Sequence, residues 1–279
     1  MRRATKADLP AIRAFLHERI ETSMFPLANL RDHGFAGDAP RSVDFWLAED
    51  GGRLTDVLCQ TREGVVMPQC PSADVAAQRA ALAGREILGL IGERGQVRAL
   101  QAALGATQWA AALDEDETLF ALAPDDLVIP PGETELRPVA AADPSTVTDW
   151  MAAYVIEALH GEEGPAAEEA RRRYENAVAG DTYAVLCAGE TPVALTGFNA
   201  RIPEAVQVGG VYTPPALRGQ GHARRAVALH LAQAFAQGAR RAILFARDPA
   251  AIAAYRAIGF RPRGAFSLCI FRDRQVCHG

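Results

Sequence analysis

The spacing of apolar positions predicts alternating helices and strands in the second half of the chain. Apolar side chains recur at helical intervals over residues 147–159, and a second helix is predicted from Pro165 to Ala179. Two β-rich runs at 183–188 and 193–199 flank a turn and predict a hairpin. The elements predicted after the hairpin are a strand at 206–213, a helix at 219–237, a strand at 242–246, a short helix that Asp248 caps and that ends at Gly259, and a strand at 267–271.

A segment rich in proline and glycine separates this half from the first. Residues 123–133 contain Pro124, Pro130, Pro131 and Gly132, which oppose a continuous helix or a central strand. We therefore expect two domains, 1–132 and 133–279. The two halves also open alike, at residues 2–12 and 136–144, and this pattern indicates an internal duplication.

Composition narrows the class of protein. Apolar residues make up 49% of the chain and charged residues 23%, which is typical of globular proteins. No apolar run approaches the ~20 residues of a membrane helix, and no secretory signal is visible, so we expect no membrane partner. The cysteines are scattered, which predicts neither disulfides nor a metal site and favours a cytoplasmic location.

The charge distribution argues against a nucleic-acid partner. The first 132 residues carry a net charge of −6 and the remainder +1, so neither half has the basic excess of a nucleic-acid binder. Aspartate and glutamate therefore dominate the first half.

The glycines after the strand at 206–213 predict an anion site. Backbone N–H groups at a helix start are unpaired and carry partial positive charge. Because Gly219 and Gly221 have no side chains, a phosphate can approach these groups closely. The pair Gly209 and Gly210 inside the strand predicts a bulge or the close approach of another backbone.

Two motifs in this region resemble the GNAT superfamily of acetyltransferases. Residues 218–223, Arg-Gly-Gln-Gly-His-Ala, are similar to that family's (Arg/Gln)-x-x-Gly-x-(Gly/Ala) pyrophosphate motif. Residues 255–260, Tyr-Arg-Ala-Ile-Gly-Phe, are similar to its Tyr-x-x-x-Gly-Phe segment. We call the pyrophosphate motif at 218–223 the cradle. The resemblance extends over 133–271. The first half resembles a degenerate copy, as in tandem-GNAT proteins, with residues 92–97 as a partial match to the cradle.

The resemblance implies a fold and an activity. The implied fold class is α/β (α+β), with two GNAT-like units that each hold a mixed, mostly antiparallel sheet flanked by helices. The implied activity moves an acetyl group from acetyl-CoA, with no metal, directly to an amine without an acyl-enzyme. Tyr255 corresponds to the general acid that protonates the departing thiolate, and a backbone N–H near Val211 is expected to stabilise the oxyanion. The implied cofactor-binding residues are Val211, Tyr212, Thr213, Arg218, Gly219, Gln220, Gly221, His222 and Ala223.

The sequence leaves the general base open. Glu157 on the first helix of this half and Glu204 before the cradle strand are candidates, and a chain of water molecules is a third. His222 is interpreted as a helix-start residue and His160 as a loop residue. Where the family often has an asparagine that touches the cofactor, this chain has Ala250 and Ala251, so that contact is not expected.

Two other functions are considered. A Rossmann dinucleotide site is disfavoured because Arg224 stands where a third small residue is required. A non-catalytic acyl-CoA sensor or interaction protein remains the alternative to an enzyme. The expected acceptor is a small-molecule or peptide amine, the acidic first half is expected to favour cationic amines, and the expected oligomeric state is a monomer or a homodimer.

Overall fold

The computed structural model describes residues 1–159 and 161–278, so His160 lies outside the described residues. The chain forms two compact units, with Met1–Leu119 and the segment from Gly264 in unit 1 and Phe120–Arg263 in unit 2. The sequence analysis expected a single division at 132/133, whereas strands β6 (Ala111–Leu122) and β12 (Arg261–Val276) each contribute residues to both units. The end of the chain belongs to unit 1 because β12 pairs with strand β5 there.

Unit 1 contains a sheet with the order β1-β2-β3-β4-β5-β12, antiparallel except for the parallel pair β4–β5. Its elements, besides parts of β6 and β12, are β1 (Arg2–Arg3), α1 (Leu9–His17), α2 (Ile20–His33), β2 (Val43–Asp50), β3 (Arg53–Thr61), β4 (Val65–Gln69), α3 (Val75–Leu82), β5 (Glu86–Glu93), α4 (Arg94–Ala103) and the short 3₁₀ helices η1 (Lys6–Asp8) and η2 (Ala106–Gln108).

Unit 2 repeats this order of elements. Its strands follow the order β11-β10-β9-β8-β7, antiparallel except for the parallel pair β10–β11. The elements are η3 (Pro124–Asp126), β7 (Glu135–Pro138), η4 (Val139–Ala141), α5 (Pro144–Leu159), α6 (Glu163–Gly180), β8 (Tyr183–Ala188), β9 (Thr191–Ile202), β10 (Ala205–Tyr212), η5 (Pro215–Leu217), α7 (His222–Ala236), β11 (Arg241–Ala246) and α8 (Pro249–Ala257). The predicted fold class is confirmed: the fold is mixed α/β, and the strands of each unit are mostly antiparallel with one parallel pair.

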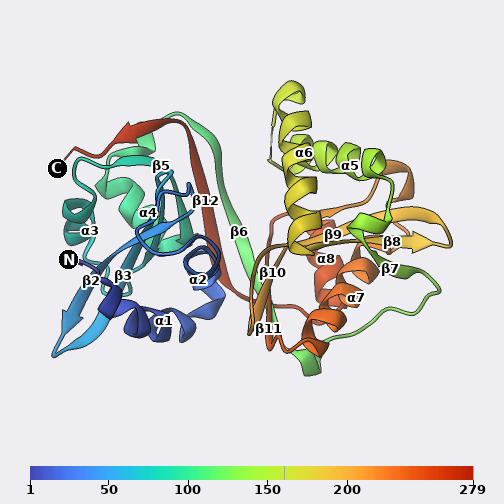
Figure 1. Cartoon of the computed structure of the whole chain (residues 1–279), viewed down its shortest axis with the longest axis horizontal. Coiled ribbons are helices and arrows are strands. Elements are labelled where there is room, and N and C mark those ends of the chain that lie inside the picture. The colour runs from blue at the N-terminus through green and yellow to red at the C-terminus, as the bar shows by residue number, and fades with distance from the viewer. Residues whose placement is uncertain (160, 279) are drawn as a thin grey trace. The chain divides into compact units, whose positions relative to one another are not determined.

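Successive side chains along each strand of unit 2 point to opposite faces of the sheet, and both faces are apolar. Val185 and Cys187 of β8 pack with Val147 and Met151 of α5. The intervening Leu186 packs in a separate cluster with α7. Helices α5 and α6 therefore cover one face of the sheet while α7 and α8 cover the other, as Figure 1 shows.

The helix that follows the pyrophosphate motif begins later than the sequence predicted. Helix α7 begins at His222, three residues later than expected, and Gly219 and Gly221 lie in the preceding loop. Their φ angles of 78° and 81° are left-handed, a conformation that glycine adopts without a steric penalty. These two glycines therefore shape the loop rather than the helix.

The proline-rich segment is fixed to unit 2. Arg225 of α7 donates hydrogen bonds to the carbonyl oxygens of Gly132 at 2.6 Å and Thr134 at 3.0 Å, and to that of Pro130. Near the other end of the segment, the backbone of Asp126 passes so close to Gly259 that a side chain there would overlap its carbonyl oxygen. The segment thus packs as part of the domain although it contains no long element.

The five cysteines are buried free thiols. Cys277, which lies after the last strand, is only 3% exposed. Among the described helices, none is long and apolar enough to cross a membrane.

Candidate active site

Strands β10 and β11 start as neighbours and then separate. Their parallel pairing joins Ala205, Val206 and Gln207 to residues 241–243, and within the described residues it ends there. Strand β10 nevertheless continues to Tyr212 and β11 to Ala246. On the side that faces β11, the backbone N–H and C=O groups of the last residues of β10 therefore form no hydrogen bonds with β11. An extended ligand can bind such groups as an added strand.

A bulge lies on this separated part of β10, as the glycine pair predicted. Gly210 and Val211 stand opposite the single residue Thr196 of β9. Gly210 has a φ of 62°, and the hydroxyl of Tyr183 occupies the space of its missing side chain. The bulge turns the backbone around Val211 away from the regular ladder.

The loop from Arg218 to Gly221 forms an open helix start. In the described part of the chain, no side chain caps the first N–H groups of α7. A β-carbon built on Gly219 would meet no atom within 4 Å, so space is open beside the loop. Unpaired N–H groups at the positive end of a 15-residue helix form an anion site.

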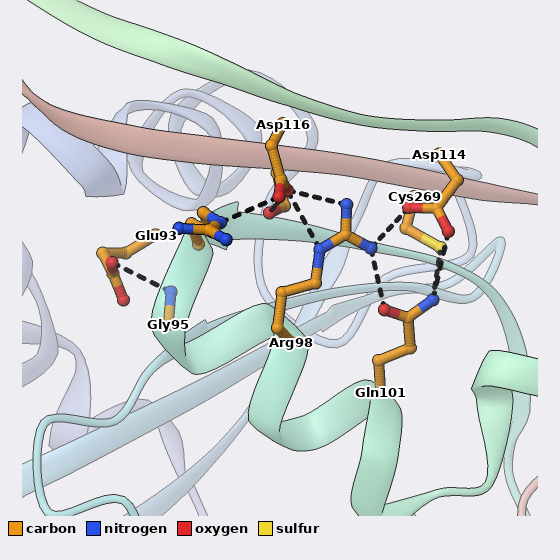
Figure 2. A network of polar contacts seen from close by, with 9 residues as sticks. Glu93, Gly95, Arg98, Gln101, Asp114, Asp116 and Cys269 are labelled. Atoms are coloured by element: carbon orange, nitrogen blue, oxygen red, sulfur yellow. Dashed lines mark hydrogen bonds and ion pairs between the residues drawn. The ribbon is translucent and has the colours of Figure 1, made fainter.

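Side chains close the starts of helices α3 and α4 of unit 1, and Figure 2 shows the start of α4. The carboxylate of Glu93 accepts hydrogen bonds from the N–H groups of Gly95 and Gln96, both at 2.9 Å. Arg98, one turn on in α4, binds Asp114 and Asp116 of β6 and thereby fixes the helix to the sheet. A carboxylate of the chain itself thus fills the position that a phosphate would need.

The prediction that residues 92–97 are the counterpart of the cradle is therefore wrong. Strand β5 runs parallel to β4 as β11 does to β10, so the turn from β5 to α4 matches the turn from β11 to α8. The counterpart of the cradle is the loop 70–74 before α3, where Asp74 accepts a hydrogen bond from the N–H of Ala77 at 2.9 Å. The glycines misled the sequence analysis because their spacing does not show which strand precedes them.

Three side chains meet beside the cradle. Glu157 of α5 accepts a hydrogen bond from Arg218 at 2.6 Å and a longer one from the hydroxyl of Tyr212 at 3.3 Å. Arg218 also donates to the carbonyl of Thr213 at 2.9 Å, and its guanidinium lies 5.7 Å from the ring centroid of Tyr212. The hydrogen bond to Glu157 raises the pKa of Arg218, while burial and then Glu157 raise the pKa of Tyr212. At neutral pH the cluster therefore holds a charged guanidinium and a protonated phenol.

Sequence reasoning missed a second arginine at the loop. A β-carbon built on Gly221 would lie 3.0 Å from the Nε of Arg224, so this exposed guanidinium runs beside the cradle. The signal was present in the sequence, because a residue three positions after the N-cap points back toward the helix start. It was read only as evidence against a dinucleotide site.

Glu204 does not join the other candidates. It lies in the turn before β10, where its carbonyl oxygen accepts hydrogen bonds from the N–H groups of Arg240 at 2.7 Å and Arg241 at 3.1 Å. Tyr212 and the cradle are at the other end of this eight-residue strand, roughly 25 Å away at 3.3 Å per residue. The structure therefore brings Glu157, but not Glu204, to the cradle.

Tyr255 lies on α8, the helix that follows β11. Because β10 and β11 are parallel, α7 and α8 start from the same edge of the sheet. The ring of Tyr255 is half-buried, with its centroid 6.1 Å from that of Phe260 at an angle of 68°. Asp248 caps this helix through the N–H of Ala251 at 2.8 Å, as the sequence predicted.

These features define a domain in which two parallel strands part and lead into a glycine loop with an open helix start. Residues 147–260 match the model of the acetyltransferase (GNAT) family. The resemblance stated from the motifs is confirmed, and the chain carries a GNAT-family acetyltransferase domain over these residues.

Solved structures share the fold at low sequence identity. A Drosophila protein aligns with a TM-score of 0.66 at 11% identity, over 96% of this chain and 97% of that one. A GCN5-related N-acetyltransferase from Kribbella flavida aligns with a TM-score of 0.54 at 19% identity, over 91% and 95% of the two chains. A GCN5-related N-acetyltransferase from Sphaerobacter thermophilus aligns with a TM-score of 0.54 at 12% identity, over 100% and 95%. A search of curated protein sequences found no match.

Proposed function

We propose that unit 2 transfers an acetyl group from acetyl-CoA directly to an amine, a small molecule or a peptide. The observation that carries this proposal is the open start of α7 at the end of the separated strand β10. Of the helices that connect the parallel strands or follow them, α3, α4 and α8 are capped by Asp74, Glu93 and Asp248, whereas α7 begins at Gly221 without a side-chain cap among the described residues. An uncapped helix start offers its donors to a diphosphate.

The residues around the cradle fit acetyl-CoA. In the proposal the N–H groups of Gly219, Gln220, Gly221, His222 and Ala223 bind the diphosphate, and Arg218 and Arg224 add positive charge. The backbone of Val211, Tyr212 and Thr213 would bind the pantetheine arm as an added strand.

The proposed reaction requires two contributions from the chain, a donor to the oxyanion and a proton for the departing sulfur. The thioester supplies the activated acyl group: the amine nitrogen forms the new C–N bond as the C–S bond breaks. In the proposal the N–H of Val211 donates to the carbonyl oxygen as negative charge develops on it. Tyr255 gives its phenolic proton to the departing sulfur and regains a proton from water.

We assign Glu157 a positioning role. The carboxylate of Glu157 already accepts hydrogen bonds from Arg218 at 2.6 Å and from Tyr212 at 3.3 Å, so its oxygens are engaged by partners within the chain. In the proposal Glu157 holds Arg218 beside the cradle. Water carries the proton of the ammonium group to solvent. We propose that unit 1 is the degenerate GNAT-like copy, because carboxylates close the starts of α3 and α4, the helices that correspond to α7 and α8.

Calorimetry and turnover with the full chain test the proposal. We expect acetyl-CoA to bind, and a panel of small amines and lysine peptides to contain an acceptor that releases free CoA thiol. An absence of binding to both acetyl-CoA and CoA would contradict the cradle. Tight binding without turnover on any amine would instead support a non-catalytic acyl-CoA sensor and overturn the enzyme.

A further inference from the structure

Unit 1 contains a pocket at the place that corresponds to the cradle of unit 2. It has a volume of about 370 Å³ and is lined by the ends of β2 and β3, the loop 70–74 and the first turn of α3. We call it the α3 pocket. Its lining includes Asp50, Asp56, Ser72, Asp74 and Gln78.

The α3 pocket has more negative than positive charge, because Asp50, Asp56 and Asp74 line it and the amino group of Met1 is the one cation among its lining residues. Asp56 is only 3% exposed, and within the described residues its carboxylate accepts two hydrogen bonds, from the hydroxyl of Thr55 and the N–H of Ser72, both at 2.9 Å. Among the ion pairs of the described residues, none includes Asp50, Asp56 or Asp74. A buried carboxylate without a cation is costly, because burial removes the water that stabilised its charge.

An independent observation also points to a missing donor. Gln78 lines the α3 pocket and is 3% exposed, and its Oε1 finds no hydrogen-bond donor in the described part of the chain. Buried side-chain oxygens are rarely left without a partner. A ligand that carries several N–H donors would satisfy Gln78 and neutralise Asp56 at the same time.

The geometry argues for an organic cation rather than a metal ion. In the part of the chain that the structure describes, no three carboxylate, histidine or cysteine groups are close enough to hold a metal. The aspartates therefore surround the pocket instead of converging on one point. Their charge also repels phosphates. The α3 pocket therefore favours cations, whereas the cradle at the corresponding place in unit 2 favours anions.

We propose that the α3 pocket binds a small organic cation with two amino or guanidino groups, one beside Asp56 and Gln78 and the other toward Asp50. The second charge distinguishes this ligand from a simple alkylamine, which can neutralise only one of the carboxylates. This site is separate from the proposed acetyl transfer and does not depend on it.

Calorimetry of the full chain with 1,4-diaminobutane, in the absence of acetyl-CoA, tests the site. We expect the diamine to bind at least tenfold more tightly than butylamine or Mg²⁺. Asp56→Asn should weaken the diamine at least tenfold, and Asp50→Asn, at a more exposed position, by about threefold to tenfold. Asp38→Asn is the matched control, because it removes the same charge from a fully exposed residue outside the pocket.

Two results would overturn the proposal. One is the absence of diamine binding to the unmodified chain. The other is binding that Asp50→Asn and Asp38→Asn change equally, because this would place the diamine at another site or in a diffuse electrostatic field. If Asp56→Asn does not fold, Asp50→Asn and Gln78→Leu still decide the question.

Discussion

The guanidinium of Arg218 lies 2.6 Å from the carboxylate of Glu157, although the two residues are 61 positions apart in the chain. The contact joins α5 to the first residue of the pyrophosphate motif. It connects one candidate for the general base with the residue expected to bind the diphosphate, so their roles have to be separated by experiment.

Glu157→Gln separates a base from a positioning residue. If Glu157 only holds Arg218, the variant should raise the KM for acetyl-CoA severalfold and leave kcat within about threefold. Loss of a general base would instead lower kcat by about 10²-fold or more and abolish the acidic limb of the pH–rate profile. Glu204→Gln, the same change at the far end of β10, should alter neither parameter.

Tyr255→Phe tests the general acid. Removal of the phenolic proton should lower kcat by about 10²-fold, because the thiolate must then leave without a donor, while the Kd for acetyl-CoA measured by calorimetry stays within about twofold. Tyr174→Phe, on the partly buried face of α6, is the control. An unchanged kcat in Tyr255→Phe would remove this residue from the mechanism.

Gly221→Ala tests the cradle. The left-handed φ of 81° should cost about 1–2 kcal/mol of stability with a β-carbon present, and the added methyl presses on Arg224. We expect affinity for CoA to fall at least tenfold. Gly238→Ala, at the other end of α7 with a φ of 113°, is similarly strained and should leave CoA affinity intact. Equal loss of affinity in both variants would show a general effect of instability.

Gly259→Ala tests the packing of the proline-rich segment. A β-carbon at this residue, whose φ is 105°, would overlap the carbonyl of Asp126, so we expect a loss of about 2–4 kcal/mol in the free energy of unfolding. Chemical denaturation measures it. Gly264→Ala, where a β-carbon meets nothing within 4 Å, should change stability by less than about 0.5 kcal/mol. A similarly small effect at Gly259 would contradict the close approach.

His230 predicts a pH dependence of stability. Burial, with a smaller effect of Arg201, lowers the pKa of His230 from 6.5 to about 3 in the folded chain. Below pH 6.5 the unfolded chain binds a proton that the folded chain does not, so stability falls as pH decreases from 6.5 toward 3, by up to about 1.4 kcal/mol per pH unit. His230→Leu should reduce this slope in denaturation series. An unchanged slope would show that other groups cause it.

The two-domain expectation suggests a test of whether the acidic first half favours cationic amines, namely removal of that half. A deletion of residues 1–132 would remove β5, to which β12 pairs, as well as β6. Point substitutions in unit 1 are therefore a better test of whether its acidic residues influence the acceptor.

Local patterns predicted most elements of unit 2 to within a few residues. Strand β8 was predicted with its observed bounds, and Asp248 was recognised as the cap of α8. These features depend on alternation, on capping chemistry and on glycine conformation, all of which act over a few neighbouring residues. The same local rules located the bulge at Gly210.

Residues 92–97 were misinterpreted as a partial cradle because the same local rules take no account of contacts outside the turn. A glycine-rich turn after an apolar strand looks alike whether a phosphate or the carboxylate of Glu93 occupies its N–H groups. Glu93 is adjacent in sequence, yet its role depends on where the turn places its side chain. Likewise, nothing local indicates that Asp126 lies against Gly259, 133 residues later.

The sequence by itself determined the order of helices and strands in the second half and the motifs at 218–223 and 255–260, because each arises from neighbours along the chain. Only the tertiary structure decided that β12 completes the sheet of unit 1, that α7 has an open start where α3 and α4 do not, and that Glu157 holds Arg218. These facts depend on hydrogen bonds and ion pairs between residues far apart in sequence. Such contacts are set when the sheets and helices pack together, and no local pattern records them.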